Sequence, residues 1–313
     1  MATTTRVNPA VPLDTPAPRR RRRSLGTRDT VVLALMLGVP LALSLLLVWG
    51  PALMSVGLSF TRWNGIGGFA AAEPVGGENY QQITTNYPQF WPALQHNVIW
   101  LVVFLLLATP VGLLLAVLLD KEIRGSRVYQ SVIFLPVVLS LALVGFIWQL
   151  IYSRDQGLLN AALGTDVDWI GDSRINLWAA LLAASWRHVG YVMVLFLAGL
   201  KAVDPALKEA ASLDGANEVQ VFRHVVLPSL APTSVVVLVI TVIEALRAFD
   251  LVYVLNRGRN GLELLSVLVT DNIIGEASRI GYGSAVATIL LVVSLGVILP
   301  YLLLILRERR EHP

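Results

Sequence analysis

The chain of 313 residues contains no cysteine and little charge. The absence of cysteine excludes disulfide bonds, thiolate metal sites and cysteine nucleophiles. Charged residues make up 14% of the sequence, whereas soluble domains carry about a quarter. Hydrophobic residues reach 55% and the mean hydropathy is +0.67, so the composition predicts a membrane protein.

Motifs for catalysis and metal binding are also missing. The only lysines are Lys121, Lys201 and Lys208, and none of them follows a glycine. A phosphate-binding loop of the type G-x-x-x-x-G-K-[ST] is therefore impossible, so this chain cannot supply its own ATP hydrolysis. The histidines lie far apart and lack H-E-x-x-H spacing, and no carboxylate, serine or histidine grouping has catalytic spacing. We expect no enzymatic activity, no metal and no cofactor.

What the sequence does contain is long apolar runs, each able to cross about 30 Å of hydrocarbon. They occupy residues 31–59, 93–119, 129–151, 177–200, 233–255 and 284–306. The predicted fold is all-α: a polytopic membrane protein with six transmembrane helices. Prolines within these runs predict kinks, which neighbouring groups in the protein can accommodate: Pro40, Pro51, Pro110, Pro136 and Pro300.

Positive charge predicts the orientation of the spans. With both termini in the cytoplasm, most lysines and arginines lie inside, as the positive-inside rule requires. Residues 1–29 are rich in Arg, Pro and Thr and poor in large apolar side chains, which predicts a disordered cytoplasmic tail. Its arginines precede a membrane helix, so we expect them to contact anionic membrane lipids and not nucleic acid.

A charged island, residues 204–232, separates two of the apolar runs. Asp204 can cap a helix that begins with a proline and ends at Gly215. The pair Asn217 and Gln220 has the spacing of a capping box for a second short helix. The island is therefore predicted to form a helix, a tight glycine turn and a helix on the cytoplasmic side.

Two further features of this island are expectations. Pro228 argues against extending the second helix far. We also expect Leu213, Phe222 and Leu227 to pack beneath the first helix and keep it stiff.

The same island carries a family pattern. It reads Glu209-Ala210-Ala211, then Ser212-Leu213-Asp214-Gly215-Ala216, then Phe222 before Leu227-Pro228. This string resembles the EAA loop of ATP-binding-cassette (ABC) importer permeases, in the form found in the carbohydrate-importer branch. The resemblance implies a cytoplasmic coupling helix that docks on an ATPase subunit through Glu209, Ala210, Ala211, Asp214, Gly215, Leu227 and Pro228. Without the family pattern, these residues would indicate only a solvated hairpin between membrane helices.

Other strings are similar to the first-permease type of sugar systems. They are Gly157-Leu158-Leu159-Asn160, Asp168-Trp169-Ile170 and Phe249-Asp250-Leu251-Val252-Tyr253. The sequence then departs from the family, which often continues with Gly-Gly-Pro, whereas Arg257-Gly258-Arg259-Asn260-Gly261 stands here. Which solute is carried does not follow from these strings.

The resemblance implies a complete transport machine in the plasma membrane. Residues 30–310 would form the transmembrane domain, and its partners would be a second permease subunit, two cytoplasmic ATP-binding subunits and an extracytoplasmic solute-binding protein. The implied function is uptake of a sugar or oligosaccharide. Two alternatives stay open: the same machinery for another solute such as glycerol phosphate, or an ATPase-independent channel or carrier.

Charged residues within the spans predict the pathway. Glu244, Arg247 and Asp250 lie about one turn apart, so one continuous helix would place them on one face, and Arg187 lies at similar depth in the span before. An unpaired charge in hydrocarbon is costly, so this face should look into the protein or a water-filled cavity. Glu244 can pair with Arg247 three residues later or with Arg187, and such a pair could equally be structural and hold helices together.

Aromatic and amide side chains near these charges would suit a sugar, because aromatic faces cover its apolar side and planar polar groups pair with its hydroxyls. We therefore predict that the pathway also includes Trp148, Gln149, Trp186, Tyr191 and Asn97. Other tryptophans near span ends are expected to be membrane-interface residues: Trp91, Trp100 and Trp178.

Overall fold

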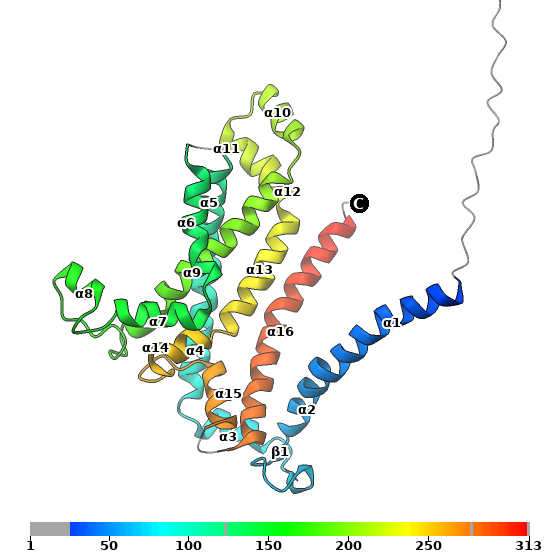
Figure 1. Ribbon diagram of the computed structural model, residues 1–313, viewed down its shortest axis with the longest axis vertical. Helices are drawn as coiled ribbons and strands as arrows, with labels where there is room; N and C mark the ends of the chain where they lie inside the picture. The colour runs from blue at the N-terminus through cyan, green and yellow to red at the C-terminus, as the bar shows by residue number, and fades with distance from the viewer. Residues whose placement is uncertain (1–25, 122–123, 276–277, 312–313) are drawn as a thin grey trace, which may run out of the picture. The chain divides into compact units, whose positions relative to one another are not determined.

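A computed structural model describes residues 26–121, 124–275 and 278–311 (Figure 1). Residues 1–25 of the expected tail lie outside this part of the chain. Within it, helices dominate, and the one sheet is the antiparallel pair of β1 (Thr61–Arg62) and β2 (Glu73–Pro74). The all-α prediction is confirmed.

The chain divides into two compact units, Met1–Ala52 and Leu53–Pro313. The described part of the first unit is α1 (Thr27–Ser44), the π-helical segment η1 (Leu45–Trp49) and the start of α2 (Gly50–Leu58). Every side chain of α1 is exposed, although most are apolar. A helix that is apolar all round fits a membrane span.

The second unit begins with the rest of α2 and contains the β1–β2 pair and the 3-10 turn η2 (Phe69–Ala71). Its helices follow in this order: α3 (Glu78–Asn86), α4 (Phe90–Val103), η3 (Phe104–Ala108), α5 (Thr109–Asp120), α6 (Ser126–Val138), α7 (Leu141–Ile151), α8 (Leu158–Leu163), α9 (Asn176–Lys201), α10 (Pro205–Leu213), α11 (Glu218–Val221), η4 (Phe222–Val226), α12 (Leu227–Ser229), α13 (Ala231–Leu246), α14 (Asp250–Asn256), α15 (Leu265–Ile273) and α16 (Ile280–Glu311).

Candidate membrane spans fall into two groups among the described residues. Four are helical stretches of sufficient length and hydropathy: Thr27–Leu58, Phe90–Asp120, Asn176–Lys201 and Ile280–Leu303. The other two are bent pairs, α6 with α7 at 101° and the α11–α12 stretch with the α13–α14 stretch at 69°. Counting each pair as one span gives the predicted number of six.

The bends have local causes. Between α6 and α7, Ser140 adopts an extended conformation, and its hydroxyl accepts a hydrogen bond from Leu143 N at 3.2 Å, which caps a new helix. The α13 helix ends at Leu246, and Phe249 has non-helical backbone angles of φ −133° and ψ −62°. The expectation of one continuous helix over residues 233–255 is therefore wrong, because α13 and α14 are separate.

Three π-helical segments precede prolines. The segments η1, η3 and η4 end two residues before Pro51, Pro110 and Pro228 respectively. A proline lacks the N–H of an α-helical hydrogen bond, and its ring crowds the carbonyl four residues earlier. A wider π turn relieves this crowding without ending the helix. At Pro228 the helix continues for only one more residue, to Ser229, and the chain turns at Leu230, so the second short helix does not extend far beyond Pro228, as expected.

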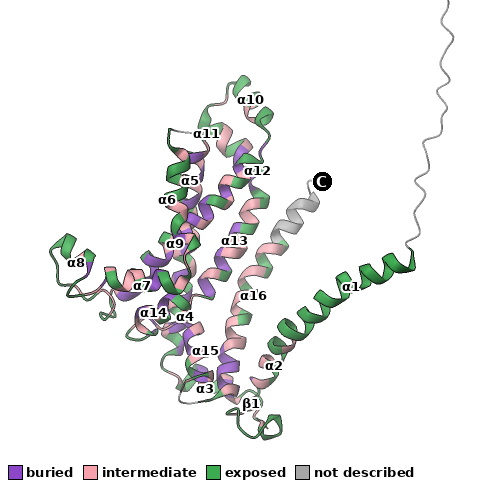
Figure 2. Ribbon diagram, viewed as in Figure 1, coloured by how far each residue is buried: buried purple, intermediate pink, exposed green. Residues whose placement is uncertain are grey.

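Many buried residues of the second unit lie along α9 (Figure 2), whose most apolar stretch is half buried, and a separate buried cluster joins α3, α4, α15 and α16. Neighbouring helices approach it closely at glycines. A Cβ on Gly190 would lie 2.3 Å from the Ile133 oxygen of α6, and one on Gly112 of α5 would lie 2.6 Å from Val192. Small residues at such contacts allow helices in membranes to pack by van der Waals contact.

The loop around α8 is organised by one side chain. Asn160 is buried, donates to the carbonyls of Arg154 and Val167, and accepts from the Trp169 indole at 2.8 Å. The Asn and Trp of the two family-like strings in this loop thus form one hydrogen-bonded unit. On its surface, Arg154 pairs with Asp166 at 2.9 Å.

Candidate functional site

The first candidate site is the hairpin over residues 204–232, which we call the coupling hairpin. Its first helix, α10, begins as predicted: Pro205 is the first helical residue, and Ala206 N donates to the Asp204 carboxylate at 2.9 Å. The helix ends at Leu213, and Gly215 follows with φ +86°. A glycine adopts this left-handed conformation without the strain that a side chain would cause.

The second helix of the hairpin is capped at its N-terminus by two reciprocal hydrogen bonds. Gln220 N donates to the Asn217 side chain, and Asn217 N donates to the Gln220 side chain, both at 2.9 Å. This reciprocal pair is the predicted capping box. Local hydrogen bonds therefore define both helices of the coupling hairpin.

The α10 helix presents its side chains to the surface. None of its residues is buried, and Glu209 and Ala210 are exposed beside the half-buried Ala211. Leu213 is 89% exposed, so the expectation that it packs beneath the helix is wrong. The half-buried Phe222 does pack against the core, whereas Leu227 is exposed. An uncovered apolar side chain at the end of a stiff helix is suited to contact with another protein.

Ion pairs join the coupling hairpin to the membrane helices. The Asp120 carboxylate at the end of α5 lies 3.2 Å from Lys201 of α9 and 3.4 Å from Lys208 of α10. Next to it, Lys121 pairs with Glu218 of α11 at 2.6 Å. Asp120 was not among the residues predicted from the sequence, although an acidic residue at the end of a span near lysines is a signal for such a contact. A displacement of α10 would therefore pull directly on the ends of α5 and α9.

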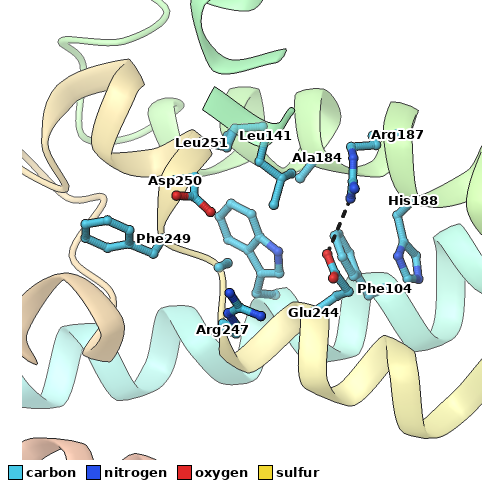
Figure 3. Close-up of a pocket in the computed structure, with 12 residues that line it drawn as sticks. Phe104, Leu141, Ala184, Arg187, His188, Glu244, Arg247, Phe249, Asp250 and Leu251 are labelled. Carbon is cyan, nitrogen blue, oxygen red and sulfur yellow. Dashed lines mark hydrogen bonds and ion pairs between the residues drawn. The ribbon is translucent and has the colours of Figure 1, made fainter. Parts of the chain in front are cut away.

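The second candidate site is a cavity of about 100 Å³ between α4, α9 and the α13–α14 break, which we call the charged cavity (Figure 3). Arg187 and Glu244 face each other across it, with Nη1 and Oε2 3.4 Å apart. Their side chains are 20% and 33% exposed, so water screens the pair only in part. Of the two pairings expected for Glu244, with Arg247 or with Arg187, the structure forms the one with Arg187.

The other two predicted charges also line the charged cavity, but from different positions. Arg247 follows the last residue of α13, and Asp250 is the first residue of α14. Because the helix breaks between them, the single helical face predicted for Glu244, Arg247 and Asp250 does not exist. The break instead points charges into the cavity from two helix ends. Irregular backbone at membrane depth is tolerated where it is buried in protein or lines a polar cavity.

A buried polar chain lies behind the charged cavity. His188 Nε2 is 3.1 Å from the Thr241 hydroxyl, which is 3.5 Å from the Thr109 hydroxyl. The His188 ring also stacks on Phe104 at 4.3 Å between centroids. Through these contacts α9 packs against α13 and η3, and α13 contacts α5 next to them.

Several residues that were not predicted for the pathway also line the charged cavity, among them Trp100, Phe104, His188 and Phe249. Trp100 was expected at the membrane interface, and this is wrong, since it is 1% exposed. Its indole nitrogen and Arg187 Nε are buried without a hydrogen-bond partner among the described residues. The expected interface residues Trp91 and Trp178 are exposed.

The remaining predicted pathway residues lie outside the lining of this cavity. Asn97 accepts from Leu265 N at 2.9 Å, and Gln149 donates to the Leu255 carbonyl at 3.4 Å. Both amides thus join helices. Trp148 and Trp186 contact each other edge to face at 5.8 Å, and Tyr191 is half buried in α9. Their contact with solute stays a prediction.

Comparison with known proteins identifies the family. The family model described as "Binding-protein-dependent transport system inner membrane component" matches residues 108–312. The chain is 35% identical to the xylose/arabinose import permease protein XacH of Haloferax volcanii, over 85% of each chain. It is 35% identical to the arabinooligosaccharides transport system permease protein AraP of Bacillus subtilis, over 71% of this chain and 73% of that protein.

The fold also matches a solved structure, that of a bacterial ABC transporter involved in the import of the acidic polysaccharide alginate. The TM-score is 0.73 with 21% identity, and the match covers 87% of this chain and 93% of the other. The chain therefore belongs to the family of binding-protein-dependent transport system inner membrane components, and it is a multi-pass membrane permease of the ABC importer type.

Proposed function

We propose that this permease forms half of the membrane pathway for a sugar or oligosaccharide and couples to separate ATP-binding subunits through the coupling hairpin. In this proposal both termini are cytoplasmic. A second permease completes the pathway, and an extracytoplasmic binding protein delivers the solute. The main support is the exposed α10 helix, capped at both ends and tied through Asp120 to α5 and α9.

The proposed mechanism is mechanical. Closure of the ATPase dimer displaces α10, with Glu209 paired to a basic residue of the ATPase. The hairpin keeps its internal hydrogen bonds, so the displacement reaches α5 and α9 through the Asp120 ion pairs. Both helices also belong to the polar chain behind the charged cavity, so their movement would change that cavity. ATP hydrolysis is thereby converted into alternating access.

The charged cavity is the proposed point of solute contact. Arg187, Glu244, Arg247 and Asp250 offer charged donors and acceptors, and Phe249 offers an aromatic face. Such a mixture suits a hydroxyl-rich ring. A sugar is further supported by the relatives named for xylose, arabinose and arabinooligosaccharides.

Another solute for the same machinery is the second candidate. A relative at 32% identity over 72% of this chain, from a Synechocystis strain, is named for uptake of osmoprotective compounds. Binding assays on the partner binding protein would separate this candidate from a sugar importer. An ATPase-independent channel would instead give solute flux when the chain is reconstituted alone.

The absence of native cysteine permits a clean test, because each introduced cysteine is unique. We expect Leu213→Cys to be shielded from a membrane-impermeant maleimide in intact cells and to cross-link to the ATPase subunit in membranes. Leu158→Cys on α8, an exposed leucine at 68%, is the matched control and should be labelled from outside. Labelling of Leu213→Cys from outside, or no cross-link to the ATPase, would overturn the coupling assignment.

A further inference from the structure

Two nitrogen donors at the charged cavity have no acceptor. The Nε1 atom of Trp100 and the Nε atom of Arg187 are both buried, and neither forms a hydrogen bond within the part of the chain that the structure describes. Both residues line the cavity, Trp100 from α4 and Arg187 from α9. Buried polar groups in native proteins are nearly always hydrogen-bonded, so two unpartnered donors beside a cavity indicate a ligand that carries an acceptor.

Glu244 sets a second requirement for that ligand. Its Oε2 atom accepts from Arg187 Nη1, whereas its Oε1 atom has no hydrogen bond among the described residues. A carboxylate oxygen can only accept, so the ligand group that meets it must donate. A hydroxyl both donates and accepts. A ligand carboxylate cannot donate and would be repelled by Glu244, and an ammonium group cannot accept and would be repelled by Arg187.

The charged groups that line the cavity balance one another. Two arginines, Arg187 and Arg247, are matched by two carboxylates, Glu244 and Asp250. A charged solute would therefore bring a charge that the site does not compensate, and an uncompensated charge at membrane depth is costly. The lining favours an uncharged solute for this reason.

The size of the cavity limits how much of a solute can enter. Its volume of about 100 Å³ is well below the range of about 300–1,000 Å³ that is typical of sites enclosing a whole ligand. Arg247 and Asp250 are exposed, whereas Trp100 is buried, so the cavity has an open side and a closed end. A sugar ring is too large for this space, but a hydroxyl on a short arm can reach into it.

We infer that the charged cavity binds the hydroxymethyl group of an uncharged sugar, while the sugar ring stays outside it. The hydroxymethyl oxygen accepts from the free donors of Trp100 and Arg187, and its proton is donated to Glu244. Trp100 and Glu244 are then specificity-determining residues, because Trp100 favours a hydroxyl over a methyl group and Glu244 excludes a carboxylate. This inference rests on the proposed function, since it takes the charged cavity as the point of solute contact.

The test uses the assembled importer without its binding protein, so that a sugar meets only the membrane pathway. Three probes differ at one substituent: D-glucose carries a hydroxymethyl group, its deoxy analogue a methyl group, and D-glucuronate a carboxylate. The Kd of each is obtained from the rise of the thermal unfolding midpoint with sugar concentration. We expect D-glucose to bind about tenfold more tightly than either analogue, because the methyl group leaves the donors unpaired and the carboxylate adds an unbalanced charge.

Trp100→Phe tests the indole donor. The variant keeps an aromatic ring but lacks the N–H, so it should weaken binding of D-glucose about fivefold and leave binding of the deoxy analogue unchanged. Trp178→Phe is the matched control, because Trp178 is exposed on α9 and does not line the cavity. Equal losses for both sugars in Trp100→Phe would mean that the indole acts through its shape alone, and would overturn its assignment.

Glu244→Gln tests the exclusion of acidic sugars. It removes one negative charge at nearly constant shape and leaves Arg187 free to pair with a ligand carboxylate. Binding of D-glucuronate should therefore tighten about tenfold relative to D-glucose. Glu263→Gln, at a half-buried glutamate that does not line the cavity, is the control and should keep the preference of the wild type. An unchanged preference in Glu244→Gln would overturn the role of Glu244 in selection.

The remaining outcomes separate this inference from the proposed function. Equal affinities of the wild type for the three probes, or no binding of any, would mean that water alone fills the cavity, and would overturn the inference. Tighter binding of D-glucuronate than of D-glucose would also overturn it, although a sugar would still contact the cavity. Cross-linking of Leu213→Cys to the ATPase is read separately, so the coupling function can stand where the hydroxymethyl site fails.

Discussion

The coupling hairpin and the charged cavity are stabilised in opposite ways. The hairpin is exposed, and its defining hydrogen bonds join residues two or three positions apart, as between Asn217 and Gln220. The charged cavity is assembled from distant segments, since Arg187 and Glu244 are 57 residues apart in sequence. A structure held by local bonds can move as a rigid piece. A cavity held by contacts between helices must change when those helices move.

This difference assigns separate tasks to the two regions. In the proposed mechanism the hairpin transmits a displacement without deforming, and the cavity responds to it. Variants of the hairpin should therefore abolish transport without changing stability, whereas variants of the cavity should change both. The largest effect is expected at the turn of the hairpin.

Gly215→Pro should reduce uptake to background. Gly215 has φ +86°, which proline cannot adopt, and its N–H donates to Ser212 O at 3.1 Å. The turn between the two helices would be lost, and α10 would no longer move together with α11. Solute uptake in cells, amount of protein in the membrane and the thermal unfolding midpoint are measured together.

The control for this variant is Gly76→Pro, at another exposed glycine with positive φ and open space around it. It should retain most of the uptake. Normal uptake by Gly215→Pro would show that the turn has no role in coupling. A large fall in the unfolding midpoint would contradict the expectation that this turn does not stabilise the core.

Arg187→Met should impair both stability and uptake. The substitution leaves the Glu244 carboxylate without its 3.4 Å partner in a partly buried cavity. Removing one member of a fully buried pair costs about 3–5 kcal/mol, and the partial exposure here reduces the expected loss to about 1–3 kcal/mol. The thermal unfolding midpoint and the uptake rate of the purified, reconstituted importer are measured.

The double variant Arg187→Met with Glu244→Gln distinguishes a structural role from solute contact. It removes both charges, so stability should recover by about 1–2 kcal/mol relative to Arg187→Met alone. Uptake should stay low if these side chains contact the solute. If uptake recovers together with stability, and solute preference is unchanged, the pair is structural only.

Much of the coupling hairpin could be predicted from the sequence, whereas the charged cavity could be predicted only in part. Its helix ends are set by residues that cap or end a helix through bonds to nearby positions, namely Asp204, Gly215 and Asn217. Residue type and spacing were therefore sufficient to predict where the helices begin and end. The cavity lining depends on the break after Leu246 and on which face of α4 turns inward. No periodic pattern signals either feature, and Trp100 was assigned to the interface for that reason.

The prolines show a second limit of prediction from sequence. A proline in a helix predicts disruption, but the kind of disruption depends on the surroundings. Before Pro110 and Pro228 the helix widens into a π segment and continues, and Pro136 lies within α6. The bend after α6 comes instead from the cap at Ser140. The positions of the prolines therefore show where a helix can be irregular. They do not show whether the helix bends, widens into a π segment or stays regular there.

Thr241→Val should destabilise the permease by about 1–2 kcal/mol, because the buried His188 ring would lose its partner at 3.1 Å. The shape of the side chain is nearly unchanged, so a fall in the unfolding midpoint reports the hydrogen bond. Thr241→Ser keeps the hydroxyl and is the control. Equal midpoints for the valine and serine variants would show that the polar chain does not contribute to stability.

Asp120→Asn should lower uptake about fivefold at unchanged stability of the core. The loss of the carboxylate charge weakens two lysine contacts worth about 1 kcal/mol together. Looser attachment of α10 should lower transport relative to ATP hydrolysis, so the number of solutes transported per ATP is the measurement. Asp155→Asn, an exposed acid in the α8 loop, is the control. An unchanged ratio in Asp120→Asn would remove this contact from the coupling path.

The smallest effect is expected from Asp166→Asn in the α8 loop. The Arg154 guanidinium donates to Asp166 and holds the pKa of that carboxyl below its ordinary value of 3.8. A lowered pKa in the folded state stabilises the fold above the ordinary value, and this contribution is lost as pH falls through the folded-state pKa. Near neutral pH the contribution is constant, and because the two side chains are 55% and 73% exposed it is small. The unfolding midpoints of variant and wild type should therefore stay close together near neutral pH and converge further only in acid.

A clear difference between the two midpoints near neutral pH would contradict this expectation. It would mean that the surface pair of Arg154 and Asp166 determines the shape of the loop in addition to the Asn160 hydrogen bonds beneath it.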